Sequence, residues 1–128
     1  MLSIKEKVKE VCRNKAGKKF LREEIIDLVV QSFPGTKRRS VIPSDYCYNR
    51  VNAGITFDFH MFELTERGEY ICLGINHPYT GKIYWEDKWG TIKEVGEWQE
   101  GRFRLNDQAP ELAKEKWGVN VWKKPEDP

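Results

Sequence analysis

The spacing of apolar side chains changes once along this chain, near residue 55. Before that point they recur every three or four positions, as Ile4, Val8 and Val11 do, which is the spacing of one face of an α-helix. Beyond it, from Phe57 to Leu64, they approach alternation with polar residues, which is the spacing of a half-buried strand. The 128 residues therefore predict one domain that is helical first and built of hairpins afterwards.

Three helices are expected in the first part of the chain. Ser3 opens a capping-box pattern, which predicts the start of a helix that ends near Gly17. A second helix is expected over residues 22–32, where a Phe-Pro-Gly sequence stops it. We expect a third helix over residues 39–52, with Pro43 in its first turn, where a missing N–H is harmless.

Strands are expected in the second part. Residues 62–73 read as a hairpin that turns at Glu66-Arg67-Gly68. Further strands are expected at 82–85 and 91–95, and a third hairpin leads into residues 102–105. Residues 110–117 are expected to form a short final helix closed by a glycine.

The order of three helices followed by a hairpin, within about seventy residues, is that of a winged helix-turn-helix. The sequence thus predicts an α+β fold with a winged-helix core over residues 1–75. A β-rich extension over residues 76–128 holds all five tryptophans and is expected to pack on that core, so that residues 1–128 form a single domain.

The third expected helix can be tested for a DNA-facing side. At about 100° per residue, Arg39, Tyr46 and Arg50 fall within one arc, opposite Val41 and Val51. A recognition helix needs such a pair of faces, one for the core and one for the major groove. The alternative is a solvated basic helix start, which charge runs usually are. The residues expected to bind nucleic acid are Lys37, Arg38, Arg39, Ser40, Tyr46, Asn49, Arg50 and, at the hairpin tip, Arg67.

Charge is divided unevenly along the chain, although the net charge is only +2. Residues 1–60 carry 12 Lys and Arg against 7 Asp and Glu, a net of +5, whereas residues 61–128 carry 10 against 13, a net of −3. A basic half favours a polyanion, so the expected partner is double-stranded DNA. The acidic, tryptophan-rich half supports the alternative of a protein-interaction domain on a winged-helix scaffold.

Four runs of residues resemble a known domain type: Phe20–Ile26, Arg39–Arg50, Phe62–Glu63 and Arg67–Tyr70. Over about residues 18–75 they are similar to the winged-helix domains of bacterial and phage proteins, of the type also attached to restriction-type endonucleases. The resemblance implies a stand-alone DNA-binding module, either a regulator or a component of restriction or phage defence. Leu21 and Pro43 depart from the pattern, since Thr or Ser commonly caps helix two and proline interrupts a recognition helix.

Four aromatic side chains of the extension suggest a second kind of site. Tyr84, Trp85 and Trp89 lie near the turn that Tyr79 begins, and aromatic rings can stack a flipped or modified base. The alternative is an extension whose aromatic residues simply cover a sheet. Complete burial of Trp85 and Trp89 would exclude the aromatic pocket.

Enzyme signatures are missing from the sequence. There is no phosphate-binding P-loop, no G-x-S-x-G elbow and no H-E-x-x-H, so neither an enzyme nor a cofactor is expected. The spacing of Cys72, His60 and His77 matches no common zinc pattern, so no metal is expected either. The acidic and basic residues at 86–88 leave a metal-dependent nuclease as a minor alternative.

Cysteine usage and hydropathy indicate the compartment. Cys12, Cys47 and Cys72 are odd in number and form no C-x-x-C pair, so they are expected to be buried apolar residues rather than a disulfide framework. The N-terminus alternates Lys and Glu and lacks an apolar signal segment, and no apolar run is long enough to cross a membrane. A cytoplasmic protein without membrane contact is therefore expected.

Overall fold

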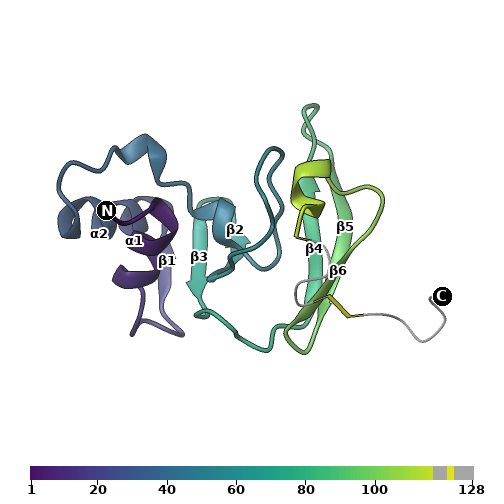
Figure 1. Ribbon diagram of the computed structural model, residues 1–128, viewed down its shortest axis with the longest axis horizontal. Coiled ribbons are helices and arrows are strands. Elements are labelled where there is room, and N and C mark those ends of the chain that lie inside the picture. The colour runs from purple at the N-terminus through teal and green to yellow at the C-terminus, as the bar shows by residue number, and fades with distance from the viewer. Residues whose placement is uncertain (117–120, 123–128) are drawn as a thin grey trace. The chain divides into compact units, whose positions relative to one another are not determined.

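The computed structural model describes residues 1–116 and 121–122 of the chain (Figure 1). The chain divides into two compact units. Unit 1 consists of Met1–Tyr48 and Phe59–Ile75, and unit 2 of Asn49–Asp58 and the residues from Asn76 onward. This division differs from the expected boundary at residue 75, because the segment Asn49–Asp58 belongs with the C-terminal part.

The two α-helices of unit 1 begin where the sequence predicts. Helix α1 spans Ile4–Val11, and the Ser3 hydroxyl accepts a hydrogen bond from the Glu6 amide at 3.2 Å while the Glu6 carboxylate accepts one from the Ser3 amide. The capping box is confirmed, although α1 ends well before Gly17. Helix α2 spans Arg22–Ser32, as expected.

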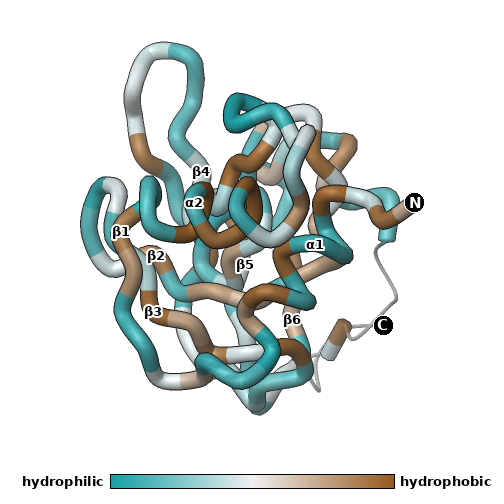
Figure 2. Tube along the Cα trace, turned by 90° about the vertical axis from the view of Figure 1, so that its left-hand side faces the viewer, coloured by the Kyte–Doolittle hydropathy of each residue, from teal (hydrophilic) through white to brown (hydrophobic). Residues whose placement is uncertain are grey.

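A three-stranded antiparallel sheet completes unit 1. Strands β1 (Lys19–Leu21), β2 (Phe62–Glu66) and β3 (Glu69–Cys72) lie in the order β1-β3-β2, so the predicted hairpin is confirmed. Gly68 turns it with a positive φ of 74°, which glycine adopts at little cost. Hydrophobic positions recur along α1 and α2 (Figure 2). The core cluster consists of Val8, Cys12, Ile25, Ile26, Val29, Val41, Tyr46, Cys47, Met61, Phe62, Tyr70 and Cys72.

The expected third helix does not form. Two short 3₁₀ helices, η1 (Arg38–Ser40) and η2 (Pro43–Tyr46), stand in its place. Ile42 between them is extended, with φ −120° and ψ 90°. The ring of Pro43 disfavours a helical conformation at the preceding residue, and proline has no N–H to continue the hydrogen-bond ladder. This proline therefore breaks the predicted recognition helix.

The winged helix-turn-helix prediction is wrong for this reason. In the described residues, α1 and α2 are the α-helices, and two three-stranded antiparallel sheets supply most of the regular structure. The predicted three helices followed by a hairpin do not describe this arrangement.

The sheet of unit 2 is also antiparallel. Strands β4 (Gly81–Glu86), β5 (Ile92–Gln99) and β6 (Arg102–Leu105) lie in the order β4-β5-β6, which confirms the three strands expected beyond residue 80. The 3₁₀ helix η3 (Glu111–Lys114) replaces the expected final helix, whose last residue, Trp117, lies outside the described residues together with the closing glycine.

The segment Asn49–Asp58 joins unit 2 through the edge of β4. The Tyr84 amide donates to the Asn49 carbonyl at 3.0 Å, and the Val51 amide donates to the Tyr84 carbonyl at 2.9 Å. No strand forms over residues 57–59, where alternation predicted one, because Phe57 instead enters the core of unit 2.

An aromatic cluster forms the centre of that core. The ring of Trp98 lies 5.0 Å from that of Phe103, and Phe57 meets Phe103 edge-on at 5.1 Å. These rings are buried, and such pairs add about 1 kcal/mol beyond the area that they bury. Trp98 is therefore a core residue of unit 2.

Candidate nucleic-acid interface

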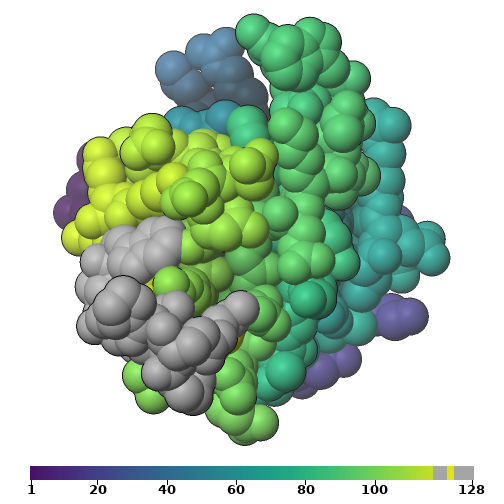
Figure 3. Space-filling model, turned by 90° about the vertical axis from the view of Figure 1, so that its right-hand side faces the viewer, coloured from purple at the N-terminus to yellow at the C-terminus, as the bar shows by residue number. Residues whose placement is uncertain are grey.

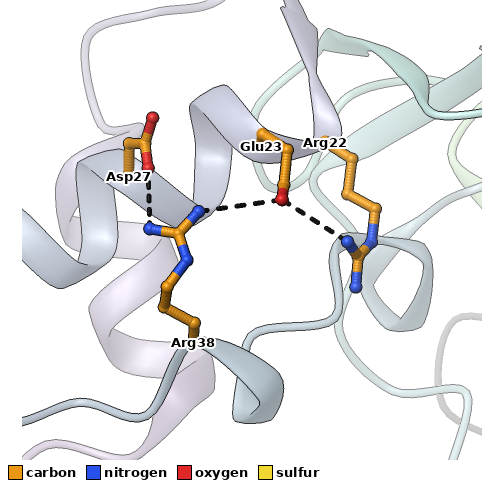
Figure 4. A network of polar contacts seen from close by, with 4 residues as sticks. All are labelled: Arg22, Glu23, Asp27 and Arg38. Atoms are coloured by element: carbon orange, nitrogen blue, oxygen red, sulfur yellow. Dashed lines mark hydrogen bonds and ion pairs between the residues drawn. The ribbon is translucent and has the colours of Figure 1, made fainter.

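One arginine, Arg38, links the basic turn at η1 to α2 (Figure 4). The Arg38 guanidinium donates to Oδ1 of Asp27 at 2.7 Å and lies 3.8 Å from Oε2 of Glu23. The hydrogen bond to Asp27 raises the pKa of Arg38, so the guanidinium stays charged. Its charge is matched by two carboxylates, which makes Arg38 an anchor for the turn.

Two more basic residues gather at the start of α2. Glu23 also pairs with Arg22, with 3.4 Å between Oε2 and Nη1 (Figure 4). The backbone amide of Arg22 donates to the Gly68 carbonyl at 2.8 Å, which holds the β2–β3 turn, and therefore Arg67, beside the beginning of α2. Segments distant in the sequence thus meet around this helix. We call Arg22, Lys37, Arg39 and Arg67 the basic surface.

Three members of the basic surface have uncompensated charges. Lys37, Arg39 and Arg67 are exposed, and none of them takes part in a side-chain hydrogen bond or ion pair within the described part of the chain. Arg13, by contrast, is also exposed but is paired with Glu10. A cation that no protein carboxylate engages can pair with a phosphate without breaking an existing contact.

Several predicted contact residues lie elsewhere. Tyr46 is only 6% exposed and packs edge-on against Phe59, and burial raises its pKa to about 12. Asn49 and Arg50 belong to unit 2, where Nε of Arg50 donates to Oδ1 of Asn52 at 3.3 Å. The predicted common face of Arg39, Tyr46 and Arg50 is wrong, because the helix that would create it is absent. Ser40 is exposed at the end of η1.

Sequence reasoning missed the acidic partners of Arg38. Glu23 and Asp27 are four residues apart, and this spacing places them on the same face of α2. That spacing was the available signal for a helix face able to receive a basic segment. The spacing did not show which arginine would pair with these two carboxylates.

The four aromatic residues of the expected pocket do not converge. Tyr79 is buried against Trp98, whereas Tyr84 and Trp85 are neighbours on β4 and point to opposite sides of the sheet. Trp89 lies in the β4–β5 turn and is 75% exposed. Neither Trp85 nor Trp89 is fully buried, but together these side chains form no shared pocket.

The β4–β5 turn is organised by a carboxylate. Oδ1 of Asp87 accepts hydrogen bonds from the amides of Trp89 and Thr91, each at 2.9 Å, and Oδ2 lies 3.7 Å from Nζ of Lys93. Burial alone would raise the pKa of Asp87, but the two amides and Lys93 outweigh it, and the pKa is lowered. This acid of the 86–88 cluster therefore shapes a turn, a role that its place in an Asp-x-x-Gly sequence could have suggested.

Two general properties of the described residues bear on function. They contain no group of three His, Cys, Asp or Glu side chains placed to hold a metal ion. No helix among them has both the length and the apolar character needed to cross a membrane.

Comparison with known proteins gives a family but no activity. The family described as domain of unknown function DUF7225 matches residues 3–105, from the N-cap of α1 to the end of β6, and so includes parts of both units. The uncharacterized protein YnaC of Bacillus subtilis strain 168 is 38% identical over 133 aligned residues, which cover 94% of this chain and 49% of that protein. The chain thus spans about half the length of this relative. No solved structure matches significantly.

Proposed function

The chain belongs to the DUF7225 family, and we propose that it binds double-stranded DNA through the basic surface of unit 1. The observation that carries the proposal is the set of three exposed, uncompensated cations, Lys37, Arg39 and Arg67, on two turns tied to α2. It requires no recognition helix, because turns and helix ends also place cations on phosphates.

Each residue has a distinct task in this proposal. Arg38 holds η1 against α2, so that its neighbours Lys37 and Arg39 project from a fixed turn. Arg39 and Arg67 can each donate two parallel hydrogen bonds to a phosphate, whereas Lys37 acts as a point charge. Such contacts position a protein on the duplex without reading bases, so binding is expected to depend weakly on sequence.

A matched pair of variants tests the assignment. We compare Lys37→Ala/Arg39→Ala/Arg67→Ala with the control Lys9→Ala/Lys88→Ala/Lys116→Ala, which removes three other exposed cations and the same net charge. Fluorescence anisotropy of a labelled duplex is measured across a salt series. The first variant should reduce the slope of log affinity against log salt by about 3, and the control by much less. An equal loss in both would show that only net charge matters.

Unit 2 supports a second candidate, a protein-interaction domain. Trp89, 75% exposed, stands in the β4–β5 turn, with Ile92 (61%) and Tyr84 (39%) on the adjoining strands. The tip of this hairpin projects at the top of Figure 3. Asp87 fixes the backbone of the turn at Trp89, and an exposed tryptophan is the kind of side chain that dominates interfaces. A partner recovered after nuclease treatment by the native protein, but not by Trp89→Ala, would support this function.

A further inference from the structure

Two cysteines that are 60 residues apart meet in the core of unit 1. Cys12 caps the C-terminus of α1, and Cys72 is the last residue of β3. The thiol of Cys72 donates a weak hydrogen bond to the carbonyl oxygen of Cys12, with 3.9 Å between Sγ and the oxygen. Both side chains are buried.

The backbone explains why these thiols meet. The Cys72 amide donates to the Lys18 carbonyl at 2.8 Å, and the Gly17 amide donates to the Cys72 carbonyl at 2.7 Å. The end of β3 is thereby held alongside the segment that leaves α1. The third cysteine, Cys47, points its thiol to the Pro43 carbonyl oxygen at 3.7 Å and provides an internal comparison.

We propose that Cys12 and Cys72 form an oxidisable dithiol, which a hydroperoxide converts into a disulfide linking α1 to β3. The Cys72 thiolate attacks one peroxide oxygen, the O–O bond breaks, and Cys72 becomes a sulfenic acid while hydroxide leaves. The Cys12 thiol then attacks that sulfur, the S–S bond forms and water leaves. In sum, two thiols and one hydrogen peroxide give one disulfide and two waters.

The opposite pKa shifts of the two thiols indicate which cysteine attacks the peroxide and which resolves the sulfenic acid. The interaction with the Cys12 thiol lowers the pKa of Cys72 and outweighs burial, which raises it, and the charge of Lys15 acts in the lowering direction. The same interaction, together with burial, raises the pKa of Cys12. Since the thiolate is the nucleophile, Cys72 reacts first and Cys12 resolves the sulfenic acid.

Access sets the rate of this reaction. Cys12 and Cys72 are 1% and 0% exposed, but the connection between α1 and β1 consists largely of exposed turn residues. Hydrogen peroxide is only slightly larger than water, so a local opening of this connection is enough to admit it. Oxidation should therefore be slower than that of an exposed thiol, yet should occur in the folded protein.

Peptide mass spectrometry tests the proposal on the full chain. The native protein is treated with hydrogen peroxide, then unfolded in the presence of an alkylating agent and digested without reductant. We expect one cross-linked species, Cys12 joined to Cys72 with the loss of two hydrogens and reversed by dithiothreitol, and Cys47 alkylated. The same treatment in urea should lose this selectivity, because the unfolded chain allows all three pairings. Three alkylated thiols in the native protein, or cross-links to Cys47 at similar yield, would overturn the proposal.

Single variants separate the two roles. Cys12→Ser, which keeps a hydrogen-bond donor but cannot form a disulfide, should leave Cys72 as a sulfenic acid that dimedone traps, whereas Cys72→Ala should abolish trapping, and Cys47→Ala should leave the Cys12–Cys72 cross-link unchanged. The initial rate in the native protein should rise with pH around a midpoint below the value of about 8.5 for an ordinary thiol. A midpoint at the ordinary value would assign the first step to an unperturbed cysteine.

Discussion

Replacing Gly96 with alanine tests the packing between β5 and β6. Gly96 lies opposite Leu105 on β6 and Ile83 on β4. An added Cβ would fall well inside the contact distance of the Arg104 carbonyl oxygen and 3.1 Å from both Cα and Cδ2 of Leu105. Leu105 is fully buried and the oxygen belongs to the backbone, so no exposed side chain can move to make room.

The expected cost follows from these contacts. Overpacking a filled core costs about 1–3 kcal/mol, and a clash with backbone belongs at the upper end of that range. Alanine also restricts the unfolded chain, which returns roughly 0.4–1 kcal/mol. We therefore expect Gly96→Ala to lower the free energy of unfolding by about 2 kcal/mol.

Urea unfolding followed by tryptophan fluorescence measures this change, because Trp98 lies two residues away in the same core. Gly81→Ala is the matched control, since the three atoms nearest to its Cβ, the first at 3.1 Å, all belong to the side chain of Tyr79, and we expect it to cost less. If the free energy of unfolding of Gly96→Ala lies within about 0.5 kcal/mol of that of the native protein, the register that places Gly96 against Leu105 is wrong.

Four further predictions concern single contacts. A double-mutant cycle on Arg38 and Asp27, which are 49% and 50% exposed, should give a coupling energy of about 0.5 kcal/mol in urea unfolding. A coupling energy of zero would show that this ion pair does not hold η1 against α2. Ser3→Ala should cost about 1 kcal/mol, measured by thermal unfolding, and no change would mean that the capping box does not contribute to stability. The lowered pKa of Asp87 means that its contribution is present above the unfolded pKa near 3.8 and is lost as pH falls through the lower folded value. The difference in Tm between native protein and Asp87→Ala should therefore shrink in acid, and a constant difference would contradict this. Trp89→Ala should leave Tm nearly unchanged, because the side chain is 75% exposed, and a large drop would show that it packs in the folded protein.

Local signals in the sequence were enough for much of the secondary structure. The capping box at Ser3, the limits of α2 and the strand spacing beyond residue 60 depend on neighbouring residues, and the structure confirms them. Pro43 shows where a local pattern misleads. The apolar spacing around it suits a helix, but the restriction that proline places on Ile42 prevails, and two 3₁₀ helices result.

The candidate sites depend on contacts that no local pattern contains. The spacing of Glu23 and Asp27 indicated an acidic face of α2. Their pairing with Arg38 depends on the path of the loop after α2, which brings η1 next to that face. Cys12 and Cys72 are brought together only because β3 runs alongside the segment after α1. Such pairings follow from the tertiary fold, so counts and spacings could not reveal them.

The proposed binding of double-stranded DNA by unit 1 depends on three uncompensated cations, Lys37, Arg39 and Arg67. Anisotropy of a labelled mixed-sequence duplex, titrated with the native protein at about 50 and about 200 mM salt, tests it most directly. Three phosphate contacts predict that affinity falls roughly 40-fold between these concentrations, from a slope of about −0.9 per contact. Absence of binding at the lower salt, or an affinity that does not change with salt, would contradict the claim.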